Sequence, residues 1–580
     1  MKKNTFLFCF LLLLAACGPK DGIHTLKLLT TNDVHGYWFD STYTGSGTRQ
    51  SLFAVNYYVD SIRNAAGEEN VLLVDAGDCL QGDNATYYYN YVDTDAAEHL
   101  FTRLVSYMKY DVITVGNHDI ETGHAVYDKL EKQLGKHGIP LLGGNAIRND
   151  DGKPYFRTYK VFRRAGLKVA VLGYTNANNP AWMDESLWYG MHFERLVPLV
   201  QQDVDMVIAK EKPHVVIVSM HSATGKGTFD NPEAEALDLY RTLRGVDFVV
   251  CAHDHREVTF HNDSIALINT GCRAKYLGCG TLNVEVRDGK VVGKTIGSEL
   301  IKVDKSKADA RMRETFRSEF ETVRDFSFRE IGVLSTDLRS RDSYLGMSPY
   351  INLLHTVELK STGAQVAFAA PLTFNGTVKT GILVYNDLFT IYPFENQLYT
   401  MRLKGSEIKN YLEYSYDAWL DEPDGPHALR IREYDDPRNS QSGWSFVSRS
   451  YNFDSASGIN YTVNITKSKG ERVNISSMAD GSPFDPEAEY VVALTSYRAS
   501  GAGGLLTEGA GIPKADLEGR IVSRGKEIRD CVYDFINVNG IVDGESVGDA
   551  KLIGSWKFVP EKTAAKKLGD DFNLLFGQKK

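Results

Sequence analysis

Residues 26–36 read LKLLTTNDVHG, an apolar run that ends directly in Asn32, Asp33 and His35. Six further short apolar runs follow within the first 300 residues. They lie at Val71–Val74, Val112–Val115, Val169–Leu172, Val215–Val218, Phe248–Cys251 and Ala266–Ile268. Runs this short and this rich in β-branched residues are typical of strands buried on both faces.

Amphipathic stretches separate these runs, at residues 51–66, 96–109, 125–134 and 234–243. Their apolar side chains recur at helical spacing. Alternation of buried strands with amphipathic helices predicts an α/β domain, which we place at residues 24–303.

Polar side chains follow five of the predicted strands at the point where each strand ends. They are Asp33 and His35, Asp75 and Asp78, Asn117-His118-Asp119, His221, and His253-Asp254-His255. Alone, His221 is more commonly a hydrogen-bonded core histidine and Asn117 a turn residue. In open α/β sheets, however, sites form outside the carboxyl ends of strands. The joint pattern therefore predicts one crevice that binds metal.

These blocks resemble, in order and spacing, the signature blocks of calcineurin-like metallophosphoesterases, in the variant of the bacterial 5′-nucleotidase and 2′,3′-cyclic-nucleotide phosphodiesterase family. The resemblance continues at Asn386-Asp387-Leu388, Pro393-Phe394-Glu395-Asn396 and Tyr497-Arg498-Ala499-Ser500-Gly501, which look like that family's C-terminal nucleotide-binding domain. It implies an α/β fold class: a metallophosphoesterase sheet-and-helix catalytic domain followed by a smaller mixed α/β domain.

The resemblance also implies a pair of divalent metal ions and their ligands. One ion would be held by Asp33, His35 and His255, the other by Asn117, His221 and His253, with Asp78 as the bridge. Two cations about 3.5–4 Å apart can clamp a phosphate and lower the pKa of a water between them. Imidazole with hard carboxylate oxygens suits Zn²⁺, Mn²⁺ or Co²⁺.

His118 is a catalytic candidate rather than a ligand. The resemblance implies that it contacts the phosphate and helps the alkoxide leave, which requires an acidic partner to fix its tautomer. Glu121 is preferred by its position three residues later, and the adjacent Asp119 stays an alternative.

Three residues of the second half are candidates for nucleotide binding. By resemblance, Phe394 and Tyr497 would sandwich the base and Asn396 would contact it. Stacking on aromatic rings tolerates any base. The alternative for Phe394 is a core residue, as aromatics beside apolar strands usually are.

Two departures from the family pattern affect the expected substrate. Residues 369–376 lack arginines, and Ala502-Gly503-Gly504 carries no aspartate. We expect hydrolysis of nucleotide phosphate esters in nucleotide catabolism, with 2′,3′-cyclic and 3′-nucleotides slightly favoured over 5′-nucleotides. The alternatives are a hydrolase of nucleotide sugars or another anion, and a non-catalytic nucleotide-binding surface lipoprotein.

The remaining segments complete the expected organisation. The charged stretch 304–326, without Gly or Pro, predicts a connecting helix. A mixed α/β, nucleotide-binding domain is expected at residues 327–560, and a lysine-rich solvated tail at 561–580.

The beginning of the chain predicts export. Lys2 and Lys3 precede an apolar run at residues 6–14 and the sequence Leu14-Ala15-Ala16-Cys17, which resembles a bacterial lipobox. We expect a lipoprotein signal at residues 1–17, a lipid on Cys17 that attaches the protein to a membrane, and a location in the bacterial cell envelope. An ordinary secretory signal is the alternative.

Composition bounds the remaining possibilities. Five cysteines after Cys17 are too few, and odd in number, for a disulfide framework, although a Cys272–Cys279 pair stays open. The formal net charge of −10 lacks the electrostatic footprint of a duplex nucleic acid binder.

Overall fold

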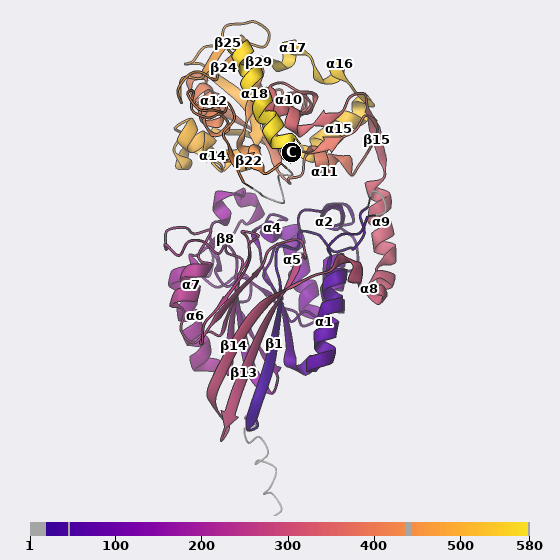
Figure 1. Cartoon of the computed structure of the whole chain (residues 1–580), viewed down its shortest axis with the longest axis vertical. Coiled ribbons are helices and arrows are strands. Elements are labelled where there is room, and N and C mark those ends of the chain that lie inside the picture. Colours follow the sequence, from indigo (N-terminus) through magenta and orange to yellow (C-terminus); the bar gives the residue numbers. More distant parts are fainter. Residues whose placement is uncertain (1–18, 44–46, 435–441, 578–580) are drawn as a thin grey trace, which may run out of the picture.

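The computed structural model describes residues 19–43, 47–434 and 442–577. The predicted signal segment, Cys17 included, lies outside the described residues. The chain forms two bodies, one below the other in Figure 1, and helix α9 runs along the side from the lower to the upper body.

The first body contains two six-stranded sheets, in the orders β14-β13-β1-β2-β3-β4 and β11-β12-β10-β9-β7-β6. In the first sheet β1 to β4 are parallel, and in the second β7, β9, β10 and β12 are parallel. The first sheet consists of β1 (Gly22–Thr31), β2 (Val71–Asp75), β3 (Val112–Thr114), β4 (Leu141–Leu142), β13 (Tyr276–Arg287) and β14 (Lys290–Lys302). The second consists of β6 (Tyr159–Arg164), β7 (Leu167–Tyr174), β9 (Val215–Met220), β10 (Phe248–Val250), β11 (Glu257–His261) and β12 (Ala266–Thr270).

Alternate side chains of each central strand face different cores. Leu28 of β1 and Val250 of β10 belong to a core made only of strands, which lies between the two sheets. Leu29 of β1 faces the helices α1 (Leu52–Ala66), α3 (Leu100–Tyr107) and α5 (His124–Lys136). Val218 of β9 faces α6 (Leu196–Glu211) and α7 (Ala236–Thr242). The body is therefore a four-layer sandwich with helices outside.

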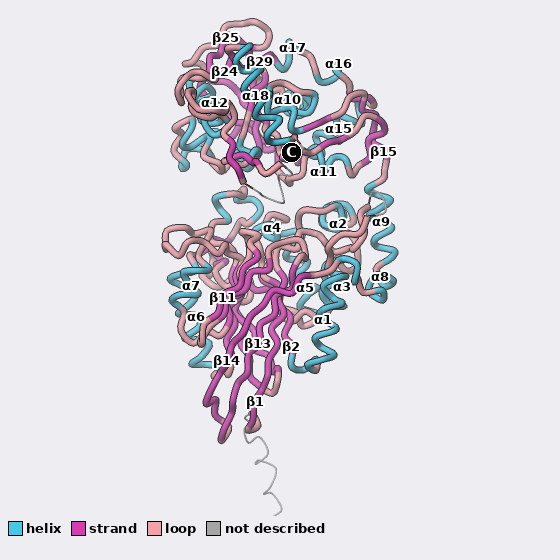
Figure 2. Tube along the Cα trace, in the orientation of Figure 1, coloured by secondary structure: helices cyan, strands magenta, loops and turns pink. Residues whose placement is uncertain are grey.

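All seven strands predicted from apolar runs are present, and the predicted α/β fold class is confirmed. The long hairpin β13–β14, prominent at the lower end of Figure 2, was not predicted. Much of β14 is exposed or half-buried, so it lacks the continuous apolar run by which buried strands were recognised.

The second body is a mixed α/β structure around a five-stranded sheet of order β23-β17-β26-β20-β27. Its strands are β17 (Val366–Ala369), β20 (Gln397–Lys404), β23 (Ser455–Ser457), β26 (Glu489–Thr495) and β27 (Ile521–Glu527). Smaller sheets join β15 (Glu330–Leu334), β19 (Gly381–Val384) and β28 (Ile541–Val542), and β24 (Ile459–Asn464), β25 (Val473–Met478) and β29 (Gly554–Val559). The main helices are α10 (Pro349–Thr362), α12 (Gly405–Trp419) and α15 (Ile528–Asn539).

The prediction of a solvated tail at 561–580 is wrong for the part that the structure describes. Residues Glu561–Phe576 form helix α18, whose Leu568 and Leu575 are buried in the core of the second body. The Asp571 carboxylate accepts the backbone N–H groups of Ala428 and Leu429. Lys562, Lys566 and Lys567 suggested a solvated tail, whereas Ala564, Leu568 and Leu575 form a buried stripe at helical spacing.

The predicted connecting helix is two helices, α8 (Ala310–Thr315) and α9 (Arg317–Ser327). Met312, Phe316 and Val323 are buried against the helical core of the first body. The connector therefore packs along that body rather than standing free in solvent.

The two bodies also touch directly. The Asn84 Nδ2 of helix α2 (Asn84–Tyr87) donates to Ser327 Oγ at 2.7 Å and to Asn386 Oδ1 at 2.8 Å. Tyr87 is buried in a core otherwise made mainly of second-body residues. These contacts hold the carboxyl ends of the first-body strands against the second body.

Among the described cysteines, Cys272 and Cys279 are free, so the structure does not pair them. Within the described ranges, no helix has the length and apolarity needed to cross a membrane.

Candidate active site

The predicted metal ligands converge at the carboxyl ends of the strands in two adjacent groups. One group consists of Asp33, His35 and His255, and the other of Asp78, His221 and His253. In each group the candidate donor atoms lie within 4.8 Å of one another. Asn117 joins the second group, because its Oδ1 lies 2.9 Å from Nδ1 of His253. All seven predicted ligands thus meet in one place.

The backbone at these ligands is unusual. Five of them have positive φ: Asp33 (48°), His35 (49°), Asp78 (61°), His253 (77°) and His255 (55°). Left-handed backbone is uncommon outside glycine and concentrates at functional sites, where the surrounding structure enforces it. The strands end abruptly here, and the sharp turns aim successive side chains inward.

Two glycines allow the loops after β2 and β3 to touch. A Cβ on Gly77 would lie 2.6 Å from the backbone nitrogen of Gly116, and a Cβ on Gly116 would lie 2.1 Å from Oδ1 of Asp78. The close approach lets the His118 N–H donate to Asp78 Oδ1 at 2.8 Å.

The histidine tautomers suit metal ligation. Nδ1 of His221 lies 2.8 Å from the carbonyl oxygen of Ala76, and Nδ1 of His35 lies 3.2 Å from that of Gln81. A carbonyl only accepts, so in the neutral rings Nδ1 carries the proton and Nε2 offers its lone pair to the site. Metal-ligating histidines are commonly oriented in this way.

The inward-facing nitrogens could serve as ligands for a cation. His221 Nε2 is buried without a hydrogen-bond partner among the described residues and lies 3.1 Å from Asp78 Oδ2. Nε2 of His35 lies only 2.9 Å from Nε2 of His255. Either a proton on one ring or a shared cation would satisfy both nitrogens. The donor set therefore fits two divalent metal ions.

The electrostatics of the site also favour positive charge. Burial lowers the pKa of His221, but Asp78 and Asp33 more than offset this and raise it to about 9. Burial would raise the pKa of Asp78, yet His221 and His118 hold it well below its usual range. Two buried carboxylates thus stay ionised and attract cations.

His118 lies beside this cluster and pairs with Glu121. His118 Nδ1 is 2.5 Å from Glu121 Oε2. Burial lowers the pKa of His118, but the nearby Asp78 and Glu121 raise it to about 10. Of the two acidic partners considered, the structure therefore pairs the His118 ring with Glu121.

Asp119 has a different position from the one expected for a partner of His118. Its carboxylate accepts the backbone N–H groups of Gly116 (2.8 Å), Asp78 (3.0 Å), Cys79 (3.0 Å) and Leu80 (3.1 Å). It fixes the loop that carries Asp78 rather than the imidazole of His118. We therefore correct the assignment of Asp119 as a catalytic candidate to a positioning residue.

A cavity of about 400 Å³ joins the metal cluster to the second body. From the first body it is lined by Asn117, His118, Glu121, His253 and His255, and from the second by Phe394, Asn396 and Tyr497. All three predicted nucleotide-binding residues thus face the same space as the metal ligands. Phe394 is half-buried and meets Tyr451 edge to face at 5.9 Å.

Sequence reasoning missed two residues of the first body that shape this cavity. Glu233 Oε1 lies 3.0 Å from Nε2 of His253, and the Trp182 ring stacks on His253 with centroids 5.1 Å apart. Both lie in loops without periodic pattern. The Trp182 loop is positioned by the second body, since Ser500 Oγ donates to the Ala181 carbonyl at 3.2 Å. No local sequence signal marks such a contact.

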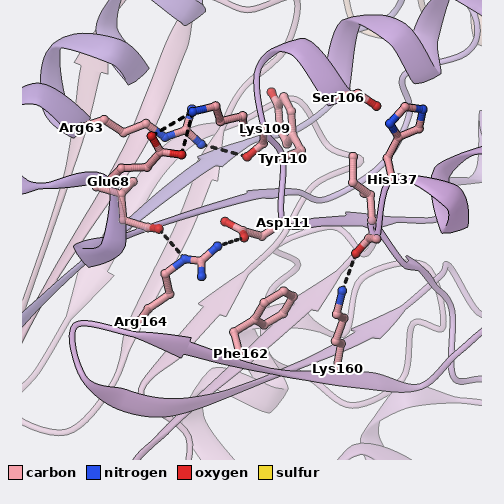
Figure 3. A pocket seen from close by; sticks show the side chains of 13 residues that line it. Arg63, Glu68, Ser106, Lys109, Tyr110, Asp111, His137, Lys160, Phe162 and Arg164 are labelled. Atoms are coloured by element: carbon pink, nitrogen blue, oxygen red, sulfur yellow. Dashed lines mark hydrogen bonds and ion pairs between the residues drawn. The ribbon is translucent and has the colours of Figure 1, made fainter.

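Another cavity, of about 370 Å³, lies at the amino ends of β2, β3 and β4 (Figure 3). Its basic side chains have partners: Lys109 pairs with Glu68 at 2.8 Å and Arg164 with Asp111. It contains none of the predicted site residues. Because sites in α/β sheets form at the carboxyl ends, we assign activity to the first cavity.

Comparisons with known proteins agree with this architecture. Residues 26–257 match the family described as calcineurin-like phosphoesterase, and residues 330–508 match the 5′-nucleotidase C-terminal domain. The Trifunctional nucleotide phosphoesterase protein of Bacillus subtilis is 23% identical to this chain over 92% of the chain's residues. The matched region is 39% of the length of the Bacillus subtilis protein.

Two further similarities cover almost whole proteins. The 2′,3′-cyclic-nucleotide 2′-phosphodiesterase/3′-nucleotidase of Haemophilus influenzae is 22% identical over 92% of this chain and 87% of its own length. A solved Staphylococcus aureus structure described as a 5′-nucleotidase shares 20% identity with a TM-score of 0.75, over 92% of this chain and 99% of the other. The latter supports the fold.

Proposed function

Because residues 26–257 belong to the calcineurin-like phosphoesterase family and residues 330–508 to the 5′-nucleotidase C-terminal domain family, we propose that this chain hydrolyses phosphate esters of nucleotides. The observation that supports the proposal is the shared cavity, which is lined both by Phe394 and Tyr497 and by three of the proposed metal ligands. A substrate with a phosphate at one end and a planar base at the other fits such a space.

Calcineurin-like phosphoesterases use a dinuclear metal site. When bound, such a centre supplies Lewis acidity that polarises the phosphoryl group and lowers the pKa of water. We propose Asp33, His35 and His255 as ligands of one ion, Asn117, His221 and His253 as ligands of the other, and Asp78 as the bridge. Imidazole and carboxylate ligands favour Zn²⁺, Mn²⁺ or Co²⁺.

The chain's own groups orient the substrate and move the proton. Glu121 holds His118 Nδ1, so Nε2 is the nitrogen left for the phosphate ester. A protonated His118 stabilises the charge that develops on the phosphoryl oxygens and donates its Nε2 proton to the departing alkoxide. Because the second body supplies part of the cavity wall, we expect partial exclusion of bulk water, which strengthens these interactions.

A substrate panel tests the proposal directly, with phosphate detection for the monoesters and chromatography of the nucleotide products for the cyclic diesters, whose ring opening releases no phosphate. Purified protein loaded with each of the three metals is expected to release phosphate from nucleoside monophosphates. Since residues 369–376 contribute only alanine and leucine side chains to the cavity, we favour 2′,3′-cyclic and 3′-nucleotides over 5′-nucleotides. A clear advantage for 5′-AMP would contradict the preference for cyclic and 3′-nucleotides but not the hydrolysis of nucleotide esters. Activity without metal would contradict the dinuclear centre.

The aromatic pair gives a separate prediction. Replacing both Phe394 and Tyr497 by Ala is expected to weaken transition-state binding of nucleotides by about 2–6 kcal/mol, from two stacking contacts. The ratio of kcat/KM for a nucleotide to that for 4-nitrophenyl phosphate measures this effect, because the artificial ester lacks a base. Tyr533→Ala, a half-buried aromatic outside the cavity lining, is the matched control. Equal losses on both substrates would make the pair structural.

We also propose that the protein acts in the bacterial cell envelope, attached through a lipid on Cys17. This proposal is based on residues 2–17, in which two lysines are followed by an apolar run and then by two alanines directly before Cys17. Cys17→Ser is expected to move the protein from the membrane fraction to the soluble fraction, while Cys9→Ser, within the apolar run, leaves it in the membrane. An unmodified N-terminus in mass spectrometry of the membrane-bound protein would count against the lipid.

A further inference from the structure

The arginine of the nucleotide-binding cavity is not free to bind phosphate. Arg498 lies in the cavity wall, but its side chain is only 3% exposed and pairs with Asp454. Nε and Nη2 donate to the two Asp454 oxygens at 3.0 and 2.8 Å, and Nη2 also to the Tyr451 carbonyl at 2.7 Å. Nη1 donates to Asn452 Oδ1 at 2.9 Å and to the Ala502 carbonyl at 3.4 Å.

These bonds use all five N–H groups of the guanidinium. Withdrawing any of them would leave the buried Asp454 or a carbonyl without its donor, which is costly in a buried position. Arg498 therefore acts as a structural element of the second body. It is also the only lysine or arginine among the described residues that line this cavity.

Apart from His118 and Arg498, the ionisable side chains of the cavity outside the metal cluster are acids. Glu121 is paired with His118, and Glu233 contacts His253. Burial raises the pKa of Glu395 to about 8, so this group is either neutral or an anion and never a counter-ion for phosphate. The positive charge available to a substrate is thus confined to the metal centre and His118.

We infer that the cavity accepts nucleotides with a single phosphate group, as monoester or cyclic diester, and rejects nucleoside diphosphates, triphosphates and nucleotide sugars. This inference rests on the proposed function and specifies its substrate class. The phosphate under attack lies at the metal cluster, so any second phosphate lies among acids, neutral polar groups and apolar side chains, with no free lysine or arginine among the described lining residues. There it loses water without gaining a cation.

The first test compares mono- and diphosphates on the wild-type protein with free metal held constant. We expect kcat/KM for ADP to be at least about a hundredfold below that of 5′-AMP, which carries its phosphate on the same 5′ oxygen, as for a partly buried charge left without a partner. Inhibition of 4-nitrophenyl phosphate cleavage supplies a binding readout. AMP should inhibit more strongly than α,β-methylene-ADP.

The second test supplies the missing charge. Leu372 lines the cavity and is half-buried, so Leu372→Arg places a guanidinium there, and Leu372→Gln is its uncharged control. We expect the arginine variant to raise the ADP-to-AMP ratio of kcat/KM roughly fivefold or more over the glutamine variant, with the gain shrinking at high salt.

The outcomes separate this inference from the proposed function. Wild-type ADP turnover within tenfold of AMP would overturn the single-phosphate rule and leave nucleotide hydrolysis standing. Equal ratios in the two folded Leu372 variants would overturn its electrostatic cause. A protein on which none of the adenosine monophosphates, cyclic or open, reacts or inhibits would overturn both.

Discussion

Asp78→Asn is expected to abolish hydrolysis of every phosphate ester, with a loss on the order of a thousandfold or more. The asparagine keeps the size of the side chain and tolerates the left-handed backbone at this position (φ 61°). The asparagine lacks the negative charge of Asp78. In our proposal this charge neutralises two cations and sets the distance between them. Lewis-acid activation contributes several kcal/mol to such reactions, which sets the scale of the expected loss.

Metal analysis should show the same change independently of turnover. The wild-type protein is expected to bind two ions per chain and Asp78→Asn at most one, measured by elemental analysis after exhaustive dialysis. Asp288→Asn is the matched control, since Asp288 is exposed in a turn of the same body and also has positive φ (51°). Active wild-type protein without metal, or a fully active Asp78→Asn, would contradict the dinuclear assignment.

The metal cluster could be predicted because its information is local. Each candidate ligand directly follows an apolar run, and strand ends of parallel sheets meet at one edge. Asp33 and His253 could be predicted as ligands without any information about the second body. Likewise Glu121 lies three residues after His118, a spacing that brings side chains together across one helical turn. The structure pairs them around the short helix α4 (Asn117–Ile120).

Residues placed by tertiary contacts could not be predicted in this way. Trp182 reaches the cavity on a loop held by the second body, through Ser500 and through Arg524, which lies 3.2 Å from Asp184. Arg498 belongs to a block associated with nucleotide binding, but only the structure shows its donors committed to Asp454 and neighbouring oxygens. Helix α18 was not predicted because Lys562, Lys566 and Lys567 suggested a solvated tail, although Leu568 and Leu575 face the core.

His118→Ala should retain the fold and both metal ions but lose roughly 10²–10⁴-fold in kcat on nucleotides, the usual contribution of a positioned general acid. The ring is not needed for the Asp78 contact, which uses the His118 backbone N–H. Glu121→Gln should cost less, about 10–100-fold, because it weakens only the orientation of the imidazole. Single-turnover rates and metal content on the same preparations measure the two effects.

The leaving group distinguishes acid catalysis from simple charge stabilisation by His118. A ribose alkoxide needs a proton as it departs, whereas 4-nitrophenolate leaves readily without one. His118→Ala should therefore lose far more activity on a nucleotide than on 4-nitrophenyl phosphate. Equal losses would confine His118 to binding the phosphoryl oxygens, and a parallel loss of metal would make it a ligand. Wild-type activity in Glu121→Gln would mean that the short His118–Glu121 contact does not set the reactive tautomer.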